Sequence, residues 1–287
     1  HYFPLIDLEK NISNRIEKLD LPGVRQIIAV ASGKGGVGKS TIAANIALAL
    51  ASKGLNVGLL DADIYGPSQG MMMGVPEGTR PEVADNLLKP VIAHEVQVMS
   101  MGFVTTDKTP AVWRGPMASG AMQQLLLQTA WDEVDTLVVD MPPGTGDIQL
   151  TLVQKASVDG VVVVTTPQDI ALLDARKAIE MFSKVNVPIL GIVENMSLHV
   201  CSQCGHQEPL FGHGGGESVA QEYGTNDLGK LPLAMSIRVQ SDGGEPAVIG
   251  DPQGEISGQF GEIVAKMIGQ LDVAPQVKLP DITISDD

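Results

Sequence analysis

The residues with the clearest capacity for chemistry are 33–41, which read GKGGVGKST. They match the phosphate-binding pattern G-x-x-x-x-G-K-[ST], and they lie between a strand-like run at 26–31 and a helix-like run at 39–52. Glycines let successive backbone N–H groups point at phosphate oxygens, and the helix N-terminus adds its dipole. Lys39 is then expected to contact the β- and γ-phosphates of ATP, and Ser40 to ligate Mg²⁺. The candidate nucleotide-binding residues of this loop are Gly33, Lys34, Gly35, Gly36, Val37, Gly38, Lys39, Ser40 and Thr41.

Two carboxylates follow the next strand-like run. Residues 56–60 are predicted to form a short buried strand that delivers Asp61 and Asp63 at its carboxyl end. Ligands of open α/β sheets gather at this end of the strands, so both carboxylates are expected to face the phosphates. A carboxylate here can orient the attacking water or hold the water shell of the metal. Residues 64–68, which come next, are typical of a switch, a segment whose conformation responds to the nucleotide.

A third carboxylate, Asp140, ends the β-branched run at 136–140. This is the Walker B pattern, in which Asp140 is expected to hold Mg²⁺ through water. The loop at 141–147 (MPPGTGD) follows directly. Its Pro and Gly content at a phosphate site favours a sensor for the γ-phosphate, with Gly144 as a nucleotide contact. A plain rigid turn is the alternative.

Lys34 is a second lysine in the phosphate loop, directly after the first glycine. With it the loop reads KGGVGKST, which resembles the deviant Walker A motif of the nitrogenase iron protein/ParA/MinD class of ATPases. The resemblance implies that Lys34 reaches across a nucleotide-sandwich dimer to the phosphates of the partner chain. One catalytic site is then built from two chains. A solvated loop lysine is the alternative.

The chain around these residues alternates strands and helices. Val-rich runs that are apolar on both faces and alternate with helices predict a parallel sheet covered on both sides. The fold class is therefore α/β, a doubly wound and mostly parallel sheet. Gly54 is expected to close the phosphate-loop helix in the C′ position, and Asn195 either reads the nucleotide base or forms a turn. The other expected elements are helices at 119–129, 170–184 and 256–271 and strands at 160–165, 189–194 and 225–231.

One P-loop ATPase domain is expected at 25–273, between an N-terminal arm at 1–24 and a C-terminal tail at 274–287. The arm contains a mixed helical stretch at 8–19 and is expected to pack loosely. The chain begins with His rather than Met, which leaves room for a missing upstream segment. Residues 70–112 are less informative, and their methionines 71–73 are expected to form a flexible apolar packing surface rather than a set of ligands.

Composition narrows the classes of function. A hydrophobic content of 44% with 18% charged residues is that of a globular protein, and 3% aromatics means a core built from aliphatic side chains. The net charge is −15 and no run of Lys and Arg is present, so we expect no nucleic acid and no anionic membrane as partner. No apolar run approaches the roughly 18 residues of a membrane span, and no signal-peptide pattern opens the chain. A cytoplasmic protein is therefore expected.

The chain holds only two cysteines, Cys201 and Cys204, too few for a disulfide framework. Two thiolates three positions apart on a turn can share one metal ion or one iron–sulfur cluster. A thioredoxin-like redox dithiol is an alternative, although such a pair usually opens a helix near the start of the chain. Zinc held by both cysteines with His199, His206 or His213 is the other alternative.

The number of cysteines that an iron–sulfur cluster needs relates the cysteine pair to a dimer of this chain. A [4Fe–4S] cluster typically takes four cysteines, and one chain offers two, so two chains offer four. A cluster shared by Cys201 and Cys204 of both chains therefore agrees with the dimer that Lys34 indicates. Such a site is exposed and takes few ligands from each chain. That arrangement suits a cluster that is handed on.

Seven segments together carry a closer resemblance, which runs from about Val24 to about Leu233. KGGVGKST, DADIYGPS, WRGPM, DMPPGTGD, TTPQDIAL, ENMS and CSQCGH, in this order, are similar to the Mrp/ApbC family of P-loop ATPases, which act as iron–sulfur cluster carriers or scaffolds. The resemblance implies a homodimer that binds ATP and Mg²⁺ and passes a [4Fe–4S] cluster to apo-proteins. Many bacterial members carry a small N-terminal domain, for which the arm is too short. The implied residues are Lys34, Lys39, Ser40, Asp63 and Asp140 at the hydrolysis centre, with Lys34, Lys39 and Asp63 catalytic, and Cys201 with Cys204 as cluster ligands.

Two other functions stay open. A ParA/MinD-like positioning ATPase without metal predicts a basic DNA-facing patch or a basic amphipathic C-terminal helix, whereas this chain ends in Asp-Asp. A nucleotide switch whose dimer is held by structural zinc is the third reading, because zinc and clusters compete for the same thiolates. Arg114 is expected either to pair with an acidic group or to contact the nucleotide.

Overall fold

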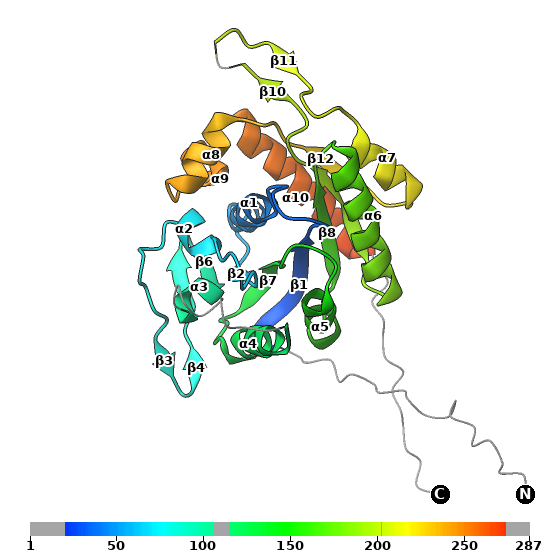
Figure 1. The fold of residues 1–287 in the computed structure, drawn as a ribbon. Helices are drawn as coiled ribbons and strands as arrows, with labels where there is room; N and C mark the ends of the chain where they lie inside the picture. The colour runs from blue at the N-terminus through cyan, green and yellow to red at the C-terminus, as the bar shows by residue number, and fades with distance from the viewer. Residues whose placement is uncertain (1–20, 106–114, 202, 274–287) are drawn as a thin grey trace, which may run out of the picture.

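The computed structural model describes residues 21–105, 115–201 and 203–273. The predicted helix at 8–19, Arg114 and the predicted tail lie outside them. A central eight-stranded sheet organises the described residues (Figure 1). All neighbouring strands in it are parallel except the last two, which are antiparallel. In spatial order the strands are β12 (Asp227–Lys230), β9 (Ile189–Glu194), β8 (Gly160–Thr165), β1 (Val24–Ala31), β7 (Val134–Asp140), β2 (Val57–Asp61), β6 (Val96–Ser100) and β5 (Val91–Ala93).

Helices cover both faces of this sheet (Figure 1). One face carries α1 (Lys39–Ala51), α8 (Met235–Asp242), α9 (Ala247–Gly250) and α10 (Glu255–Val273). The other face carries α4 (Gly115–Gln128), α5 (Asp147–Lys155), α6 (Asp169–Lys184) and α7 (Gly215–Glu222). The prediction of a doubly wound, mostly parallel sheet is thereby confirmed. The remaining short elements are α2 (Gln69–Met72), α3 (Met101–Val104) and two hairpins, β3 (Val83–Ala84) with β4 (Leu87–Leu88) and β10 (His199–Val200) with β11 (Gln207–Glu208).

The sequence explains where the core lies. Strand β8 reads GVVVVT and is buried along its whole length, as a central parallel strand covered on both faces must be. Helix α1 is apolar almost all round and is buried from Ile42 to Leu50, between the sheet and helices α9 and α10. Helix α6 is amphipathic and buries one stripe, which includes Ala171, Ala175 and Ile179. None of the helices in the described ranges is long and apolar enough to cross a membrane.

Several predicted bounds and one region needed correction. Strand β7 begins two residues before the predicted 136, and α4 begins four residues before the predicted 119. Gly54 does have a left-handed φ of 84°, but Ser52 is the C-cap, so Gly54 lies one position beyond C′. The N–H groups of Lys53 and Gly54 bond carbonyls only three residues back, which tightens the end of the helix into turns and moves the left-handed residue outward.

Residues 70–112 supply strands that the sequence did not reveal. Strand β6 joins the central sheet beside β2, and β5 folds back on it as an antiparallel edge. The methionines at 71–73 do not form one surface, because Met73 is buried in the core whereas Met71 is 57% exposed. These strands are only three to five residues long, too short for a periodic pattern to appear.

The register of the sheet brings three polar residues into one row. Asp61, Asp140 and Ser100 each end their own strand, and Asp61 pairs with Asp140 on one side and with Ser100 on the other. Neighbouring strands lie about 4.8 Å apart, so these side chains are direct neighbours. The phosphate loop leaves β1 next to this row, at the same edge of the sheet. This edge is where open α/β sheets bind their ligands.

Candidate functional site

The phosphate loop has the backbone that its glycines predict. Gly36 and Gly38 adopt left-handed φ angles of 82° and 85°, and Gly38 is the N-cap of α1. Gly33 lies against the backbone of Asp174 in α6, and Val37 is buried. A small cavity of about 220 Å³ opens over the loop. It is lined by Ser32, Lys34, Gly35, Gly36, Gly38, Lys39, Ser40, Thr41, Asp63, Ser68, Met72 and Pro143.

Substituting Gly38 with alanine is expected to abolish nucleotide binding. A Cβ at Gly38 would lie 2.2 Å from Nδ2 of Asn195, in a backbone conformation that L-residues rarely adopt. The loop must therefore shift, and its N–H groups lose their common direction. We expect the affinity for ADP to fall at least about 100-fold, as follows from the loss of several charge-assisted hydrogen bonds. Isothermal titration calorimetry measures this, with Gly54→Ala as a control: Gly54 has a similar φ but lies away from the loop. Equal losses in both variants would contradict the prediction.

Lys39 and Asp140 form a buried ion pair beneath the loop. The Lys39 ammonium contacts Oδ1 of Asp140, and it lies 3.3 Å from Oγ of Ser40. Lys39 is 5% exposed and Asp140 is fully buried. The structure thus joins the lysine and hydroxyl of the phosphate loop directly to the Walker B carboxylate.

Asp61 is a buried carboxylate that orders the switch segment. Its oxygens accept hydrogen bonds from the backbone N–H groups of Ser68 at 2.9 Å and Gln69 at 3.0 Å and from the Ser100 hydroxyl at 2.9 Å. Burial, together with the charge of Asp140, raises the pKa of Asp61 to about 7, and the hydrogen bonds from Gln69 and Ser100 oppose that rise. Asp61 therefore acts on the segment after it through backbone hydrogen bonds.

Asp63 differs from Asp61 in being partly exposed to the cavity. Its Oδ1 accepts hydrogen bonds from the N–H groups of Tyr65 and Gly66, both at 3.2 Å. It lines the cavity over the phosphate loop and also a neighbouring one formed with the 141–147 loop. Of the two carboxylates after β2, Asp63 is thus the one placed to reach a bound nucleotide.

The 141–147 loop lies against the phosphate loop. The N–H of Gly144 donates to the carbonyl of Ser32 at 3.0 Å, and Gly144 has a left-handed φ of 100°. The buried side chain of Gln149 donates to the carbonyl of Pro142 and holds the start of the loop. The predicted sensor loop is thus joined by a backbone hydrogen bond to the residue that precedes the phosphate loop.

Asn195 supports the phosphate loop through a side-chain hydrogen bond. Its Nδ2 donates to the carbonyl of Val37 at 2.9 Å, and the residue is 7% exposed. The sequence gives no sign of this contact, because an asparagine directly after a strand is typical of a turn or of a base contact. The amide hydrogen bond to Val37 gives it a third role, that of fixing the loop. Reading of the base stays a prediction.

Cys201 and Cys204 lie at the tip of the β10–β11 hairpin, which projects from the body of the protein (Figure 1). Both are free, and Cys204 is exposed. The tip is a turn in which the N–H of Cys201 donates to His206 and the N–H of Gly205 donates to Cys201, both at 2.9 Å. Backbone N–H groups of Gln203 and Cys204 lower the pKa of the Cys201 thiol, which favours the thiolate that metals and clusters require.

Among the described residues of one chain, the histidines near the hairpin do not complete a metal site. Nδ1 of His199 lies 3.3 Å from the carbonyl of Leu233 and anchors the base of the hairpin. Among the described residues no group of three or more His, Cys, Asp or Glu side chains converges on a point that could hold a metal ion. Within that part of the chain, no third His, Cys, Asp or Glu side chain is placed to ligate a metal ion together with the two cysteines.

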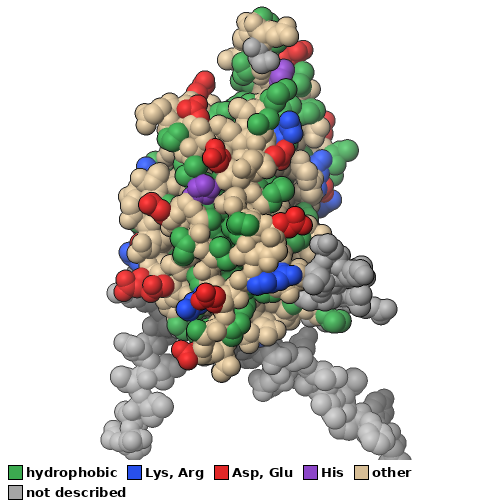
Figure 2. Space-filling view, turned by 90° about the vertical axis from the view of Figure 1, so that its left-hand side faces the viewer, with side chains coloured by type: hydrophobic (Ala, Val, Ile, Leu, Met, Phe, Trp, Pro, Cys, Tyr) green, Lys and Arg blue, Asp and Glu red, His purple; other side chains and the backbone are tan. Residues whose placement is uncertain are grey.

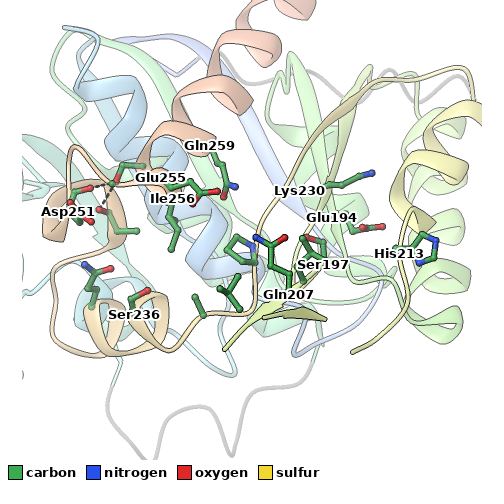
Figure 3. Close-up of a pocket in the computed structure, with 18 of the residues that line it drawn as sticks. Glu194, Ser197, Gln207, His213, Lys230, Ser236, Asp251, Glu255, Ile256 and Gln259 are labelled. Carbon is green, nitrogen blue, oxygen red and sulfur yellow. Dashed lines mark hydrogen bonds between the residues drawn. The ribbon is translucent and has the colours of Figure 1, made fainter. Parts of the chain in front are cut away.

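A larger cavity, of about 660 Å³, lies at the base of the hairpin between β9, β12, α8 and the start of α10 (Figure 3). Glu194, at the end of β9, is fully buried beside it, and its Oε2 accepts a hydrogen bond of 2.6 Å from the N–H of Gly216 in the first turn of α7. The next residue, Asn195, holds the phosphate loop. The end of β9 therefore touches both the nucleotide loop and the helix that follows the hairpin, a contact that the sequence did not indicate.

The surface seen in Figure 2 carries no extended basic patch. Lys and Arg side chains are scattered there among Asp and Glu side chains. The His side chain and apolar atoms at the top of the view belong to the projecting part of the molecule. This face is mixed in charge.

The residues present fit Mg²⁺. The metal prefers oxygen ligands and usually keeps several of its waters, and this edge of the sheet offers hydroxyl and carboxylate oxygens from Ser40, Asp63 and Asp140 around one cavity and beneath it. Gln69, whose Nε2 donates a hydrogen bond to Asp140, has a buried Oε1 without a hydrogen-bond partner among the described residues. When bound, the ion would neutralise phosphate charge.

The fold and this site define a class of protein. A mostly parallel α/β sheet with a Walker A loop after β1 and a Walker B aspartate at the end of β7 is that of a P-loop NTPase. A family profile described as ParA, NUBPL iron-transfer P-loop NTPase, matches residues 23–268. The chain belongs to this family, and by this membership it is a P-loop ATPase.

Individual relatives agree with the family. The chain is 65% identical over 238 residues to an iron-sulfur cluster carrier protein of Pseudomonas fragi, covering 83% of each chain. It is 55% identical over 250 residues to the iron-sulfur cluster carrier protein of Escherichia coli, covering 87% of this chain and 68% of the relative. Among solved structures, the nucleotide-binding protein of Archaeoglobus fulgidus in complex with ADP aligns with a TM-score of 0.71 at 36% identity, covering 83% of this chain and 93% of the other. The expected resemblance to iron–sulfur carrier ATPases is confirmed.

Proposed function

We propose that this protein is a cytoplasmic, homodimeric ATPase that carries a [4Fe–4S] cluster between its two chains and transfers it to apo-proteins. The observation that carries the proposal is the projecting hairpin, on which two free cysteines lie without a third ligand from the described part of their own chain. A second copy supplies the two thiolates that a four-cysteine cluster lacks. The relatives from Pseudomonas fragi and Escherichia coli are iron-sulfur cluster carrier proteins, which supports the same cargo.

Exposed apolar side chains near the phosphate loop support the binding of a second copy of the chain on this side of the protein. Tyr65 in the switch segment is 55% exposed, and Ile170 and Leu173 on α6 are 69% and 53% exposed. Helix α6 borders the phosphate loop, since Gly33 lies against Asp174. Apolar side chains that gather beside a functional site are typical of an interface. A dimer formed across this face would bring Lys34 close to the partner's phosphates, as the deviant Walker A motif implies.

Hydrolysis would be the switch of this carrier. A water attacks the γ-phosphorus in line, and the bond from that phosphorus to the bridging oxygen breaks, with its electron pair remaining on ADP. The oxygen of the water becomes part of the inorganic phosphate, which keeps one of the water's protons, and the other proton passes to solvent. The N–H groups of the phosphate loop and Lys39 hold the phosphates, and Lys34 of the partner chain adds positive charge where negative charge develops. Asp63 orients the water. Departure of the γ-phosphate would change the loops around Asp63 and Gly144, and with them the geometry of the dimer that grips the cluster.

Transfer is tested with cluster-loaded protein and the apo form of a [4Fe–4S] enzyme, whose regained activity reports delivery. We expect delivery from the wild-type protein with ATP and Mg²⁺ to be faster than from Lys39→Ala loaded with the same amount of iron. An excess of ferrous chelator in every sample separates direct transfer from release and recapture. Equal transfer by both proteins would overturn the coupling to ATP, and failure of both to deliver would overturn the carrier function.

A further inference from the structure

Gln69 links three parts of the nucleotide site. It is the first residue of α2, directly after the switch segment, and it is fully buried. Its Nε2 donates to the backbone carbonyl of Ser40 and to Oδ2 of Asp140, both at 2.9 Å. Its own backbone N–H donates to Oδ2 of Asp61 at 3.0 Å. One residue thereby contacts the phosphate loop, the Walker B carboxylate and the carboxylate that orders the switch.

The partners of Gln69 dictate how its amide is oriented. The Ser40 carbonyl and the Asp140 carboxylate can only accept hydrogen bonds, so the NH₂ group must face them. The carbonyl oxygen Oε1 must then point elsewhere, and it has no partner among the described residues although it is buried. Buried polar atoms are almost always hydrogen-bonded, and an exception calls for an explanation, such as an ordered water or a bound ion.

The contacts of the Gln69 amide nitrogen indicate which donor could satisfy Oε1. The two groups that Gln69 contacts belong to Ser40 and Asp140, the residues expected to hold Mg²⁺. Mg²⁺ retains several waters when it binds a protein, and a water on a cation turns its hydrogens outward as donors. Lys39 already occupies Oδ1 of Asp140, so the carboxylate is held at both oxygens, by an ammonium and by an amide.

We propose that Gln69 is a positioning residue of the magnesium site: its amide nitrogen fixes the Asp140 carboxylate, and its Oε1 accepts a hydrogen bond from a water that the metal carries. Outer groups of this kind orient the ligands of a metal and typically account for about 10- to 100-fold in metal affinity. Because Gln69 also opens α2 and binds Asp61 through its backbone, it connects the metal to the switch segment. The proposal rests on the nucleotide-binding function proposed above.

The test compares ADP affinity in saturating Mg²⁺ with ADP affinity in EDTA, by fluorescence of a labelled nucleotide, for wild type, Gln69→Leu and the closer isostere Gln69→Met. Titration of the ADP complexes with Mn²⁺, followed by EPR of the free ion, gives the metal affinity directly. Gln259→Leu is the matched control, since Oε1 of Gln259 is also buried without a partner among the described residues, but the residue lies on α10, beside the cavity at the base of the hairpin.

We expect both Gln69 variants to lose about 10- to 100-fold in metal affinity, while their ADP affinity in EDTA stays within about 2-fold of wild type. The Gln259→Leu control is expected to keep its metal affinity. If the leucine variant does not fold, the methionine variant takes its place in the test. Equal losses with and without metal would show a purely structural role and overturn the proposal, as would an unchanged metal affinity. If Mg²⁺ did not raise the ADP affinity of the wild-type protein, the proposed ATPase mechanism would fail together with this inference. If Mg²⁺ raised the ADP affinity of the wild-type protein and of the Gln69 variants equally, only this inference would be overturned.

Discussion

Alanine at either Cys201 or Cys204 is expected to remove the cluster altogether. The iron content after anaerobic reconstitution should fall from about four per dimer to near zero, because each substitution deletes two of the four thiolates at a shared site. The described residues offer no third ligand in the same chain that could take over. Iron analysis and the charge-transfer absorption of the cluster measure the loss.

His206→Ala is the matched control for the cysteine variants. His206 belongs to the same turn, where its backbone carbonyl accepts the hydrogen bond from the N–H of Cys201, a contact that alanine preserves. We expect this variant to keep the full iron content. Loss of metal from His206→Ala would contradict ligation by the cysteines alone and favour a site with histidine. Retention of the cluster by a single-cysteine variant would contradict ligation by all four thiolates.

The second large effect is expected at Lys34. Lys34→Ala should lower the rate of ATP hydrolysis on the order of 10³-fold, the lower end of the effect of a positive side chain supplied in trans to a phosphoryl-transfer site. Its ADP affinity should change only a few-fold, because the lysine acts on the partner's phosphates. Lys34 is partly exposed at the cavity, whereas Lys39 is buried against Asp140. The two lysines therefore have separable roles.

Mixed dimers distinguish action in trans from action in cis. A Lys34→Ala chain combined with a Gly38→Ala chain, which is expected not to bind nucleotide, leaves one occupied site facing an intact Lys34. If the lysine acts across the interface, this mixture should recover hydrolysis that neither variant shows alone. Absence of recovery, with dimer formation verified, would mean that Lys34 acts within its own chain or only as a solvated cation.

Much of this architecture followed from the sequence because parallel strands bring their carboxyl ends to one edge. The strand ending in Asp140 and the one that delivers Asp61 were recognisable as apolar runs that end in a carboxylate, and the sheet pairs these two aspartates directly. Strand β8 was predicted with its observed bounds because a Val run between a turn and a helix leaves little choice. Motifs of this kind are local in sequence, and local patterns predict them well.

Other features depend on contacts between distant residues, which no local pattern reveals. Gln69 meets Asp140 across 71 positions, and Asn195 meets Val37 across 158. A glutamine after a serine, or an asparagine after a strand, reads as an ordinary turn residue until the fold shows what it touches. The antiparallel strand β5 was not predicted for a related reason. Its pairing with β6 stabilises a run of three residues that has no periodicity of its own.

Native mass spectrometry of the reconstituted wild-type protein under anaerobic conditions is the decisive test of a cluster shared between two chains. We expect a complex of two chains with the mass of one [4Fe–4S] cluster, and Mössbauer spectra of a single cubane cluster from the same sample. A species with zinc and no cluster, or one intact cluster on each single chain, would contradict a cluster shared between two chains.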